Sequence, residues 1–213
     1  KTRTSKSIVD CGWGRLIFGQ TFDDPGLIAT TLQSEKQGRR DIAFYVLEPH
    51  LVLAQAPQAL FLAPSNTFRL DLTGARIKKS ATAGLTIRKA RRSDETGINA
   101  IYASHGMVPL RSGYISELTA DHPVRILVAE DKSTKHVAGV VMGVDHAAAF
   151  DDSENGASLW ALAVDGRTAL PGIGQRLVLG LAALHQAAGR GYMDLSVMHD
   201  NTEAIALYQK LGF

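Results

Sequence analysis

The sequence predicts a mixed α/β fold, with a smaller α+β region ahead of the main domain. Residues 124–130 and 137–145 read as strands, and the polar turn between them is so short that the two strands must be antiparallel. Further on, a glycine loop at 172–174 is followed by apolar residues at helical spacing. A strand over 193–197 and a helix over 201–211 complete the pattern, which favours helices packed on a mixed sheet.

Composition limits the classes of protein to consider. The chain has 213 residues, of which 45% are hydrophobic and 21% charged, as in an ordinary globular protein with its own core. A net charge of +2 gives no electrostatic argument for binding nucleic acid or a membrane surface. No apolar run approaches the roughly 20 residues of a membrane helix, and no signal peptide is recognisable. A single cysteine, Cys11, excludes an internal disulfide and favours a cytoplasmic location.

The N-terminal part of the sequence contains short elements. Asp24 followed by Pro25 is typical of an N-cap and a first helical residue, and predicts a helix over 25–35. Two β-rich runs, 42–47 and 51–55, flank a proline-containing turn and predict a hairpin.

Residues 73–84 are small, polar and basic, and predict a linker. We therefore expect an N-terminal region at 1–72 and a main domain at 85–213. The first region has no catalytic pattern of its own. We interpret it either as a lid or as a degenerate half-copy of the main fold. In the main domain we expect a strand over 85–89 and a helix capped at Ser93-Asp94 that runs to about Ala103.

The glycine loop and the last predicted helix carry the chemical signals. Gly172-Ile173-Gly174-Gln175 opens a helix, where bare N–H groups and the helix dipole favour phosphate. It is not a Walker loop, and Leu177 replaces the third glycine of a dinucleotide site. Asn201 and Tyr208, two helical turns apart, share one face. A tyrosine there is most often a core residue, but beside a cofactor its O–H can protonate a leaving thiolate.

In combination these motifs resemble the GNAT acyl-CoA N-acyltransferases. Their signature is a fourth strand ending in Leu-x-Val, a loop Arg/Gln-x-x-Gly-x-Gly/Ala, a helix, a fifth strand and Asn-x-x-Ala-x-x-Leu-Tyr-x-x-x-Gly-Phe. The matching residues are Leu162-Ala163-Val164, Gly172, Gly174, Asn201, Ala204, Leu207-Tyr208 and Gly212-Phe213. The resemblance covers about 85–213. It implies a mostly antiparallel central sheet flanked by helices, acetyl-CoA as co-substrate and no metal.

The resemblance also implies a role for each matching residue. Tyr208 would face the sulfur as general acid. The main chain of Leu162 to Val164 would pair with pantetheine, with Asn201 beside it, and the loop N–H groups would hold the pyrophosphate. The cofactor-binding residues expected on this basis are Leu162, Ala163, Val164, Leu170, Gly172, Ile173, Gly174, Gln175 and Asn201.

The sequence departs from the family pattern at three positions. Ala169 replaces the first Arg or Gln of the loop, Pro171 removes one N–H, and Arg167 is the nearby cation that could replace the lost charge. Trp160 stands where many members carry a Glu that acts as base, and an indole cannot accept a proton. Either another residue is the base, or the enzyme positions an amine that is already neutral. The candidate bases are Glu154, His146, His105, Tyr114 and, first among them, His199 because it follows the fifth strand.

A narrower resemblance involves the N-terminal region. Residues 10–18, 38–46 and 52–57 are similar to the leader of the bacterial N-acetylglutaminylglutamine synthetases, in which a GNAT half precedes an ATP-grasp half. This resemblance implies that the acceptor is the α-amine of glutamine or glutaminylglutamine, in osmoprotectant biosynthesis. The family's sixth and seventh strands would follow Phe213, so we expect the sheet to be completed by a continuation of the chain or by another segment.

Two functions of different classes follow. The first is an acetyl-CoA-dependent N-acetyltransferase acting on a small amino acid or dipeptide. The second is a non-catalytic acyl-CoA-binding or assembly module of a larger protein, favoured by the departures at Trp160, Ala169 and Pro171. The partners expected are acetyl-CoA, a small amine and a C-terminal ATP-grasp region, with a homodimer left open, and neither nucleic acid nor membrane.

Overall fold

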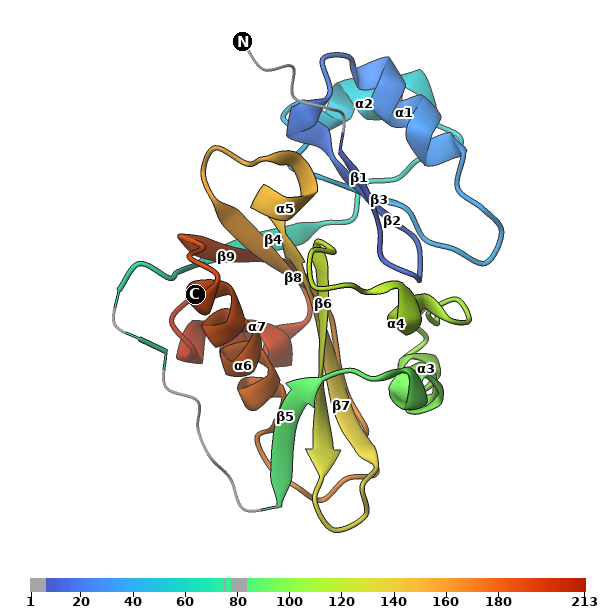
Figure 1. Ribbon diagram of the computed structural model, residues 1–213. Coiled ribbons are helices and arrows are strands. Elements are labelled where there is room, and N and C mark those ends of the chain that lie inside the picture. The colour runs from blue at the N-terminus through green and yellow to red at the C-terminus, as the bar shows by residue number, and fades with distance from the viewer. Residues whose placement is uncertain (1–6, 75, 78–83) are drawn as a thin grey trace. The chain divides into compact units, whose positions relative to one another are not determined.

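The computed structural model describes residues 7–74, 76–77 and 84–213, and these form two compact units that meet in the chain between Pro64 and Ser65 (Figure 1). We expected the boundary in the linker at 73–84, of which residues 75 and 78–83 lie outside the described part. The boundary falls earlier because residues 65–71 form a strand of the second unit's sheet.

The first unit is a small α+β structure. Its elements are β1 (Ile8–Asp10), β2 (Arg15–Phe18), the 3-10 turn η1 (Gly19–Thr21), α1 (Pro25–Gln33), β3 (Ile42–Phe44) and α2 (Pro49–Gln55). Strand β2 is central, antiparallel to β1 and parallel to β3. The core joins Ile17 of β2 to Ile28 of α1 and Val52 of α2. The helix predicted at 25–35 is confirmed, with the Asp24 carboxylate accepting from Gly26 N at 2.8 Å.

The hairpin predicted at 42–55 is wrong. Strand β3 ends at Phe44, and residues 49–55 form helix α2 instead of a second strand. A run of five mostly apolar residues is compatible with either structure, and Pro49 fits the first helical position, where its missing N–H costs nothing. One face of α2 packs through Val52 onto the core of the unit.

The second unit contains the main sheet. Its elements are β4 (Ser65–Asp71), β5 (Leu85–Lys89), the 3-10 turn η2 (Arg92–Asp94), α3 (Glu95–Ser104), α4 (Tyr114–Glu117), β6 (Val124–Asp131), β7 (Val137–Asp145), α5 (His146–Phe150), β8 (Gly156–Val164), α6 (Ile173–Ala187), β9 (Tyr192–Met198) and α7 (Thr202–Lys210). The strand order is β4-β9-β8-β7-β6-β5. Among the described strands of this sheet only β8 and β9 pair in parallel, so the predicted mixed, mostly antiparallel sheet is confirmed.

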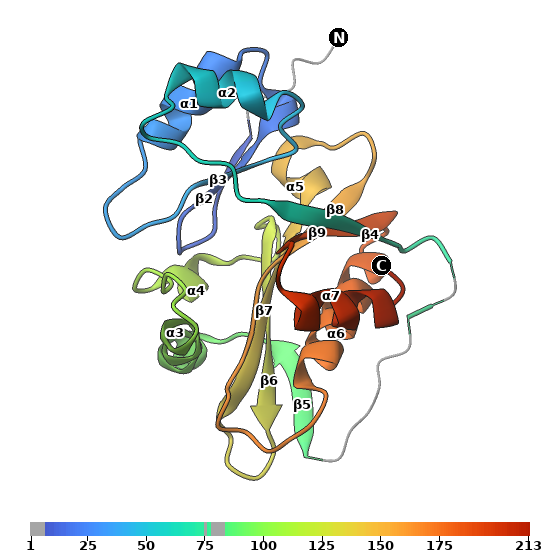
Figure 2. The same cartoon turned by 180° about the vertical axis from the view of Figure 1, so that it is seen from behind.

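Helices cover both faces of this sheet. Figures 1 and 2 show α6 and α7 on one side and α3 and α4 on the other. The main core lies under α6, where Leu177 and Leu181 meet Leu159 of β8 and Leu195 of β9. Long apolar runs in β6 and β7 are buried on both faces, as expected for strands with helices on either side.

The outer edge of β9 is covered by β4. The two strands are antiparallel from Ser65 paired with Met198 to Asp71 paired with Tyr192. Of the alternatives for completing the sheet, pairing with another segment is the one seen in the structure, and it buries an edge that would otherwise expose a row of N–H and C=O groups. No helix among the residues that the structure describes is both long and apolar enough to cross a membrane.

Candidate functional site

The site is built where β8 and β9 separate. The two strands pair in parallel from Gly156 beside Tyr192 to Leu159 beside Leu195, and the pairing ends there. Both strands continue, β8 to Val164 and β9 to Met198. Main-chain groups beyond the last pair are therefore not used by the neighbouring strand. A strand with unused N–H and C=O groups can pair with an extended amide-containing ligand.

A β-bulge shapes the second half of β8. Ala161 has φ 49, which is unusual for a residue with a side chain, and the pairing with β7 shifts register between Val140 and Met142. The bulge changes which residues face α6. Leu162 and Val164 pack against the main core on the same side as Leu159, although odd and even residues of a regular strand face opposite sides.

Helix α3 supports the same stretch from the other side of the sheet. Tyr102 donates from its hydroxyl to the Ala161 carbonyl at 3.4 Å, and His105 Nε2 lies 2.8 Å from the Val164 carbonyl oxygen. A carbonyl is only an acceptor, so His105 carries its proton on Nε2. The carbonyl of Val164, which we expected to pair with pantetheine, thus already accepts one hydrogen bond and has one lone pair left.

The glycine loop forms the N-terminus of α6. Gly172 is the N-cap with φ 71, and the first intrahelical bond runs from Arg176 N to the Gly172 carbonyl at 3.2 Å. The N–H groups of Ile173, Gly174 and Gln175 precede that bond and have no acceptor within the helix. A Cβ at Gly174 would lie 3.6 Å from Leu207 and 3.8 Å from Val164, so the loop, the end of β8 and α7 meet here.

Arg167 and Arg176 lie near this loop, and they differ in whether their guanidinium groups form an ion pair. Arg167 makes two hydrogen bonds of 2.9 and 2.8 Å to Asp165, and this ion pair lowers the pKa of Asp165 to about 2. Arg176 Nη1 is buried and has no hydrogen-bond partner among the described residues, and Nη2 lies 3.9 Å from the place of a Cβ on Gly172. Arg176 therefore replaces Arg167 as the candidate for the charge missing at Ala169.

The two predicted residues of α7 occupy different environments. Asn201 is exposed and is the N-cap of the helix, with its side-chain oxygen accepting from Ala204 N at 3.2 Å. Tyr208 is 6% exposed and belongs to the main core, and its ring is tilted against that of Phe213 with centroids 5.6 Å apart. Burial raises the pKa of Tyr208 to about 12, so its hydroxyl remains a proton donor over the whole physiological range.

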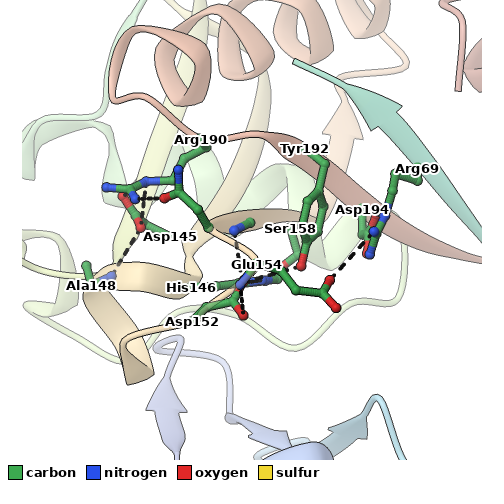
Figure 3. Close-up of polar contacts among 12 residues, drawn as sticks. Arg69, Asp145, His146, Ala148, Asp152, Glu154, Ser158, Arg190, Tyr192 and Asp194 are labelled. Atoms are coloured by element: carbon green, nitrogen blue, oxygen red, sulfur yellow. Dashed lines mark hydrogen bonds and ion pairs between the residues drawn. The ribbon is translucent and has the colours of Figure 1, made fainter. Parts of the chain in front are cut away.

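Trp160 follows the last paired residue of β8 and belongs to a buried polar cluster. Its Nε1 donates to Ser158 Oγ at 2.8 Å, and Ser158 Oγ lies 2.9 Å from His146 Nε2. Figure 3 shows His146 between Ser158 and Asp152, with Tyr192 beside them. Ser158 and His146 are fully buried, so this serine–histidine–aspartate arrangement has no access for a substrate and does not make a nucleophile.

The candidate bases are dispersed. His146 is buried, and burial lowers its pKa to about 4. Glu154 is exposed and lies 3.7 Å from Arg69, while His105 contacts Val164. Tyr114 is the first residue of α4 and is buried, and this helix lies on the face of the sheet opposite α6 and α7.

His199 is exposed one residue beyond β9. It lies at the open end of the gap between β8 and β9, roughly 13 Å along the chain from the last paired residue, Leu195. Among the described residues, no group of three or more His, Cys, Asp and Glu could hold a metal ion.

Three contributors to the site are beyond sequence reasoning. Arg176 looked like one more polar residue on a helix, and Tyr102 looked like a core residue of α3. Ser158 had no motif around it. Its bonds to Trp160 and His146 depend on how β8 and the end of β7 are placed side by side, which the local sequence does not encode.

We compared the chain with known protein families, protein sequences and solved structures. The family model of the acetyltransferase (GNAT) family matches residues 90–213. No curated protein sequence matches the chain. Among solved structures, an aminoglycoside acetyltransferase from an uncultured soil metagenomic sample is 20% identical with a TM-score of 0.51, over 61% of this chain and 91% of its own.

Two further structures are similar at the level of fold. Ard1 from Thermoplasma volcanium is 24% identical with a TM-score of 0.50, over 62% of this chain and 83% of its own. A second soil metagenomic aminoglycoside acetyltransferase, in complex with sisomicin, is 15% identical with a TM-score of 0.51, over 61% and 88%. Since the family model spans more than half of the sequence, this chain belongs to the GNAT family of N-acetyltransferases, which use acetyl-CoA as co-substrate.

Proposed function

We propose that the chain transfers the acetyl group of acetyl-CoA to the α-amine of a small amino acid or dipeptide, with glutamine and glutaminylglutamine as the first acceptors to test. The observation that carries the proposal is the separation of β8 and β9 after Leu159 and Leu195, beside the N-terminus of α6, which has no side-chain cap. Extended pantetheine fits the unused edge of β8, and the pyrophosphate fits the free N–H groups of the loop.

Each residue then has a role. Leu162, Ala163 and Val164 offer main-chain groups to pantetheine, and Asn201 lies beside it. Leu170 and residues 172–175 surround the pyrophosphate, and Arg176 adds a positive charge there. Tyr208 donates its hydroxyl to the departing sulfur. His199 lies at the open end of the gap between β8 and β9. From there it would act as a base on the acceptor, or contact the cofactor, only through a water molecule.

The absence of a base at Trp160 favours an α-amine. Without a base the amine must arrive neutral, and at pH 7.5 about 30% of the α-amine of a dipeptide, with a pKa near 7.8, is neutral. For a lysine side chain with a pKa near 10.4 the neutral fraction is about 0.1%. This difference of roughly three hundred-fold in the neutral fraction favours α-amine acceptors, independently of any contact with a binding pocket. We also propose a cytoplasmic reaction, in keeping with the single, unpaired and buried Cys11.

The experiment is a thiol-release assay with acetyl-CoA over glutamine, glutaminylglutamine, lysine and an aminoglycoside, at pH 6 to 10. We expect turnover with the α-amines, and a rate that rises tenfold per pH unit up to the pKa of the acceptor itself. A plateau well below that pKa would reveal an enzymatic base and contradict the neutral-amine route. Turnover with the aminoglycoside alone would contradict the acceptor class.

A second function is favoured by Trp160, Ala169 and Pro171: a non-catalytic module that binds acyl-CoA within a larger protein with an ATP-grasp region. Calorimetry with CoA and acetyl-CoA would give binding under both proposals. Binding without thiol release for any amine supports the module, and turnover excludes it. No binding of either ligand would contradict both.

A further inference from the structure

The position and surroundings of Trp160 carry an inference beyond the proposed reaction. Trp160 is half-buried and follows Leu159, the last residue of β8 that pairs with β9. Because side chains alternate along a strand, Trp160 and Ser158 face away from α6, on the side of α5. Part of the indole therefore remains accessible at the closed end of the gap, on the face opposite the proposed phosphate-binding loop.

The indole is held by a chain of hydrogen bonds. An indole nitrogen only donates, so at 2.8 Å the oxygen of Ser158 must accept. Ser158 Oγ also lies within hydrogen-bond distance of His146 Nε2, at 2.9 Å, so the hydroxyl connects the indole to the imidazole. Burial keeps the pKa of His146 well below neutrality, so this imidazole is neutral.

His146 is in turn fixed on several sides. Its ring stacks on Phe150 with centroids 5.5 Å apart and meets the edge of Tyr192 at 6.3 Å. Its Nδ1 lies 3.6 Å from Asp152, and that carboxylate also accepts from Tyr192 Oη at 3.3 Å and from Gly156 N at 2.9 Å. Figure 3 shows Asp152, Ser158 and Tyr192 next to His146. A buried polar chain of this kind restricts the motion of the side chains that it holds.

We propose that Trp160 is the acceptor-positioning wall of the site, and that Ser158 and His146 are positioning residues that fix the orientation of its ring. The inference rests on the proposed function. A fixed indole presents a flat apolar surface, against which an amine carrying an apolar or planar amide group can be oriented toward the thioester. Orientation of a neutral amine is the contribution that remains when no base is present.

The test uses a matched pair of variants at one position. Ser158→Thr keeps the hydroxyl, and Ser158→Val has the same shape as threonine without it. The first readout is hydrogen exchange of the Trp160 indole N–H by NMR, with the Trp13 indole as internal reference and Trp160→Phe to assign the two signals. The second readout is the KM for acetyl-CoA and for glutaminylglutamine, or for the amine of the panel with the highest turnover.

In Ser158→Val we expect exchange of the Trp160 N–H to rise at least about tenfold and the acceptor KM to rise about tenfold. The KM for acetyl-CoA should stay within about twofold, and Ser158→Thr should resemble the wild type in both readouts. If Ser158→Val fails to fold, Trp160→Phe replaces it, since it keeps a flat ring but loses the bond to Ser158, and the same rise in acceptor KM alone is expected.

If hydrogen exchange of the Trp160 indole N–H were unchanged in Ser158→Val, the proposal that Ser158 and His146 hold the indole ring would be wrong. Faster exchange with an unchanged acceptor KM would overturn the role of Trp160 in the acceptor site. An equal rise in both KM values would also contradict it, because it would indicate a general disturbance of β8. If the wild type acetylates no amine, the proposed function and the acceptor role fail together, whereas the exchange result still decides whether Ser158 holds the ring.

Discussion

Arg69 and Asp194, 125 residues apart in the chain, are joined by two parallel hydrogen bonds of 2.8 Å. Arg69 is on β4 and Asp194 is directly opposite on β9, where it is 1% exposed. The guanidinium also lies on the ring of Tyr192, 3.6 Å from its centroid. Figure 3 shows the three side chains together. This contact attaches β4 to the strand that forms one wall of the proposed cofactor site.

We therefore expect Arg69→Met to destabilise the chain. Removing one partner leaves the buried carboxylate of Asp194 without its counter-charge, which typically costs about 3–5 kcal/mol. Because the side chain of Arg69 is itself 51% exposed, water compensates in part and we expect about 2–3 kcal/mol in urea unfolding. The double variant Arg69→Met, Asp194→Leu should recover more than half of the loss.

The matched control is Arg167→Met, because Arg167 binds Asp165 with the same geometry but is 84% exposed. Because water screens this exposed ion pair, its loss should leave the free energy of unfolding nearly unchanged. If the variant at Arg69 were no less stable than this control, the ion pair would have no part in holding β4.

The two glycines of the loop should respond differently to alanine. Gly172 has φ 71, so Gly172→Ala places a side chain in the left-handed region and should cost about 1 kcal/mol. By displacing the N–H groups that follow, it should also weaken CoA binding about tenfold in calorimetry. Gly174→Ala puts a methyl group at ordinary contact distance from Leu207 and Val164, so CoA affinity should stay within about twofold.

Gly174→Ala should in addition stabilise α6 by up to about 1 kcal/mol, since alanine is the better helix former. Equal losses of CoA affinity in the two variants would mean that the phosphates approach Gly174 as closely as Gly172. A wild-type CoA affinity in Gly172→Ala would remove the loop from the proposed cofactor site.

Much of the second unit could be predicted because its sequence periods are long and unambiguous. The strand at 85–89 and the strands at 124–130 and 137–145 are confirmed within a residue or so. The glycine loop opens α6, as its residues predicted. In these segments local propensity and tertiary burial favour the same structure.

Errors arose where a short segment is decided by its neighbours. Residues 51–55 are helical because Val52 packs on the small core of the first unit. The pattern of five residues alone does not distinguish a helix from a strand. Strand β4 was assigned to the N-terminal region because its partner, β9, is more than a hundred residues away. Pairing over such a distance leaves no local trace in a single sequence.

The site was predictable in position but not in detail. The motif around Asn201 and Tyr208 located α7 beside the loop. The bulge at Ala161 could not be foreseen, since a non-glycine residue with positive φ has no sequence signal when the surrounding structure imposes it. Nor could the bond from Trp160 to Ser158, which depends on the rotamer that the fold selects.

A buried histidine should make the fold sensitive to acid. His185 is fully buried, neither ring nitrogen has a hydrogen-bond partner among the described residues, and burial lowers its pKa to about 4. The unfolded chain binds a proton at this histidine near pH 6.5, whereas the folded chain resists until about pH 4. Stability should therefore be complete above pH 6.5 and fall as the pH drops toward 4, by up to about 3 kcal/mol for this residue.

The check is urea unfolding of the wild type and His185→Leu at pH 7.5 and pH 4.5. The variant should lose less stability between the two pH values, and should be at least as stable as the wild type at pH 7.5, because an unpaired polar group is removed from the core. His136→Leu, at an exposed histidine, should follow the wild type. Identical pH dependence in all three proteins would contradict the assignment to His185.

Tyr208 is the residue through which the proposed chemistry is tested most directly. Its pKa of about 12 lies above that of a thiol, near 8.5, so complete transfer of its proton to the leaving thiolate is uphill. Its contribution should therefore be a hydrogen bond that strengthens as charge develops on the sulfur, a bond made mainly in the transition state.

Tyr208→Phe should accordingly lower kcat by about a hundredfold while the Kd for CoA from calorimetry stays within about twofold. The pH–rate profile of the wild type should show no decline attributable to this hydroxyl below pH 11. Tyr114→Phe is the matched control, since Tyr114 is equally buried but lies on the opposite face of the sheet. If Tyr208→Phe weakened CoA binding and turnover by the same factor, Tyr208 would be a packing residue of the cofactor site, and the leaving thiolate would depart without a donor from α7.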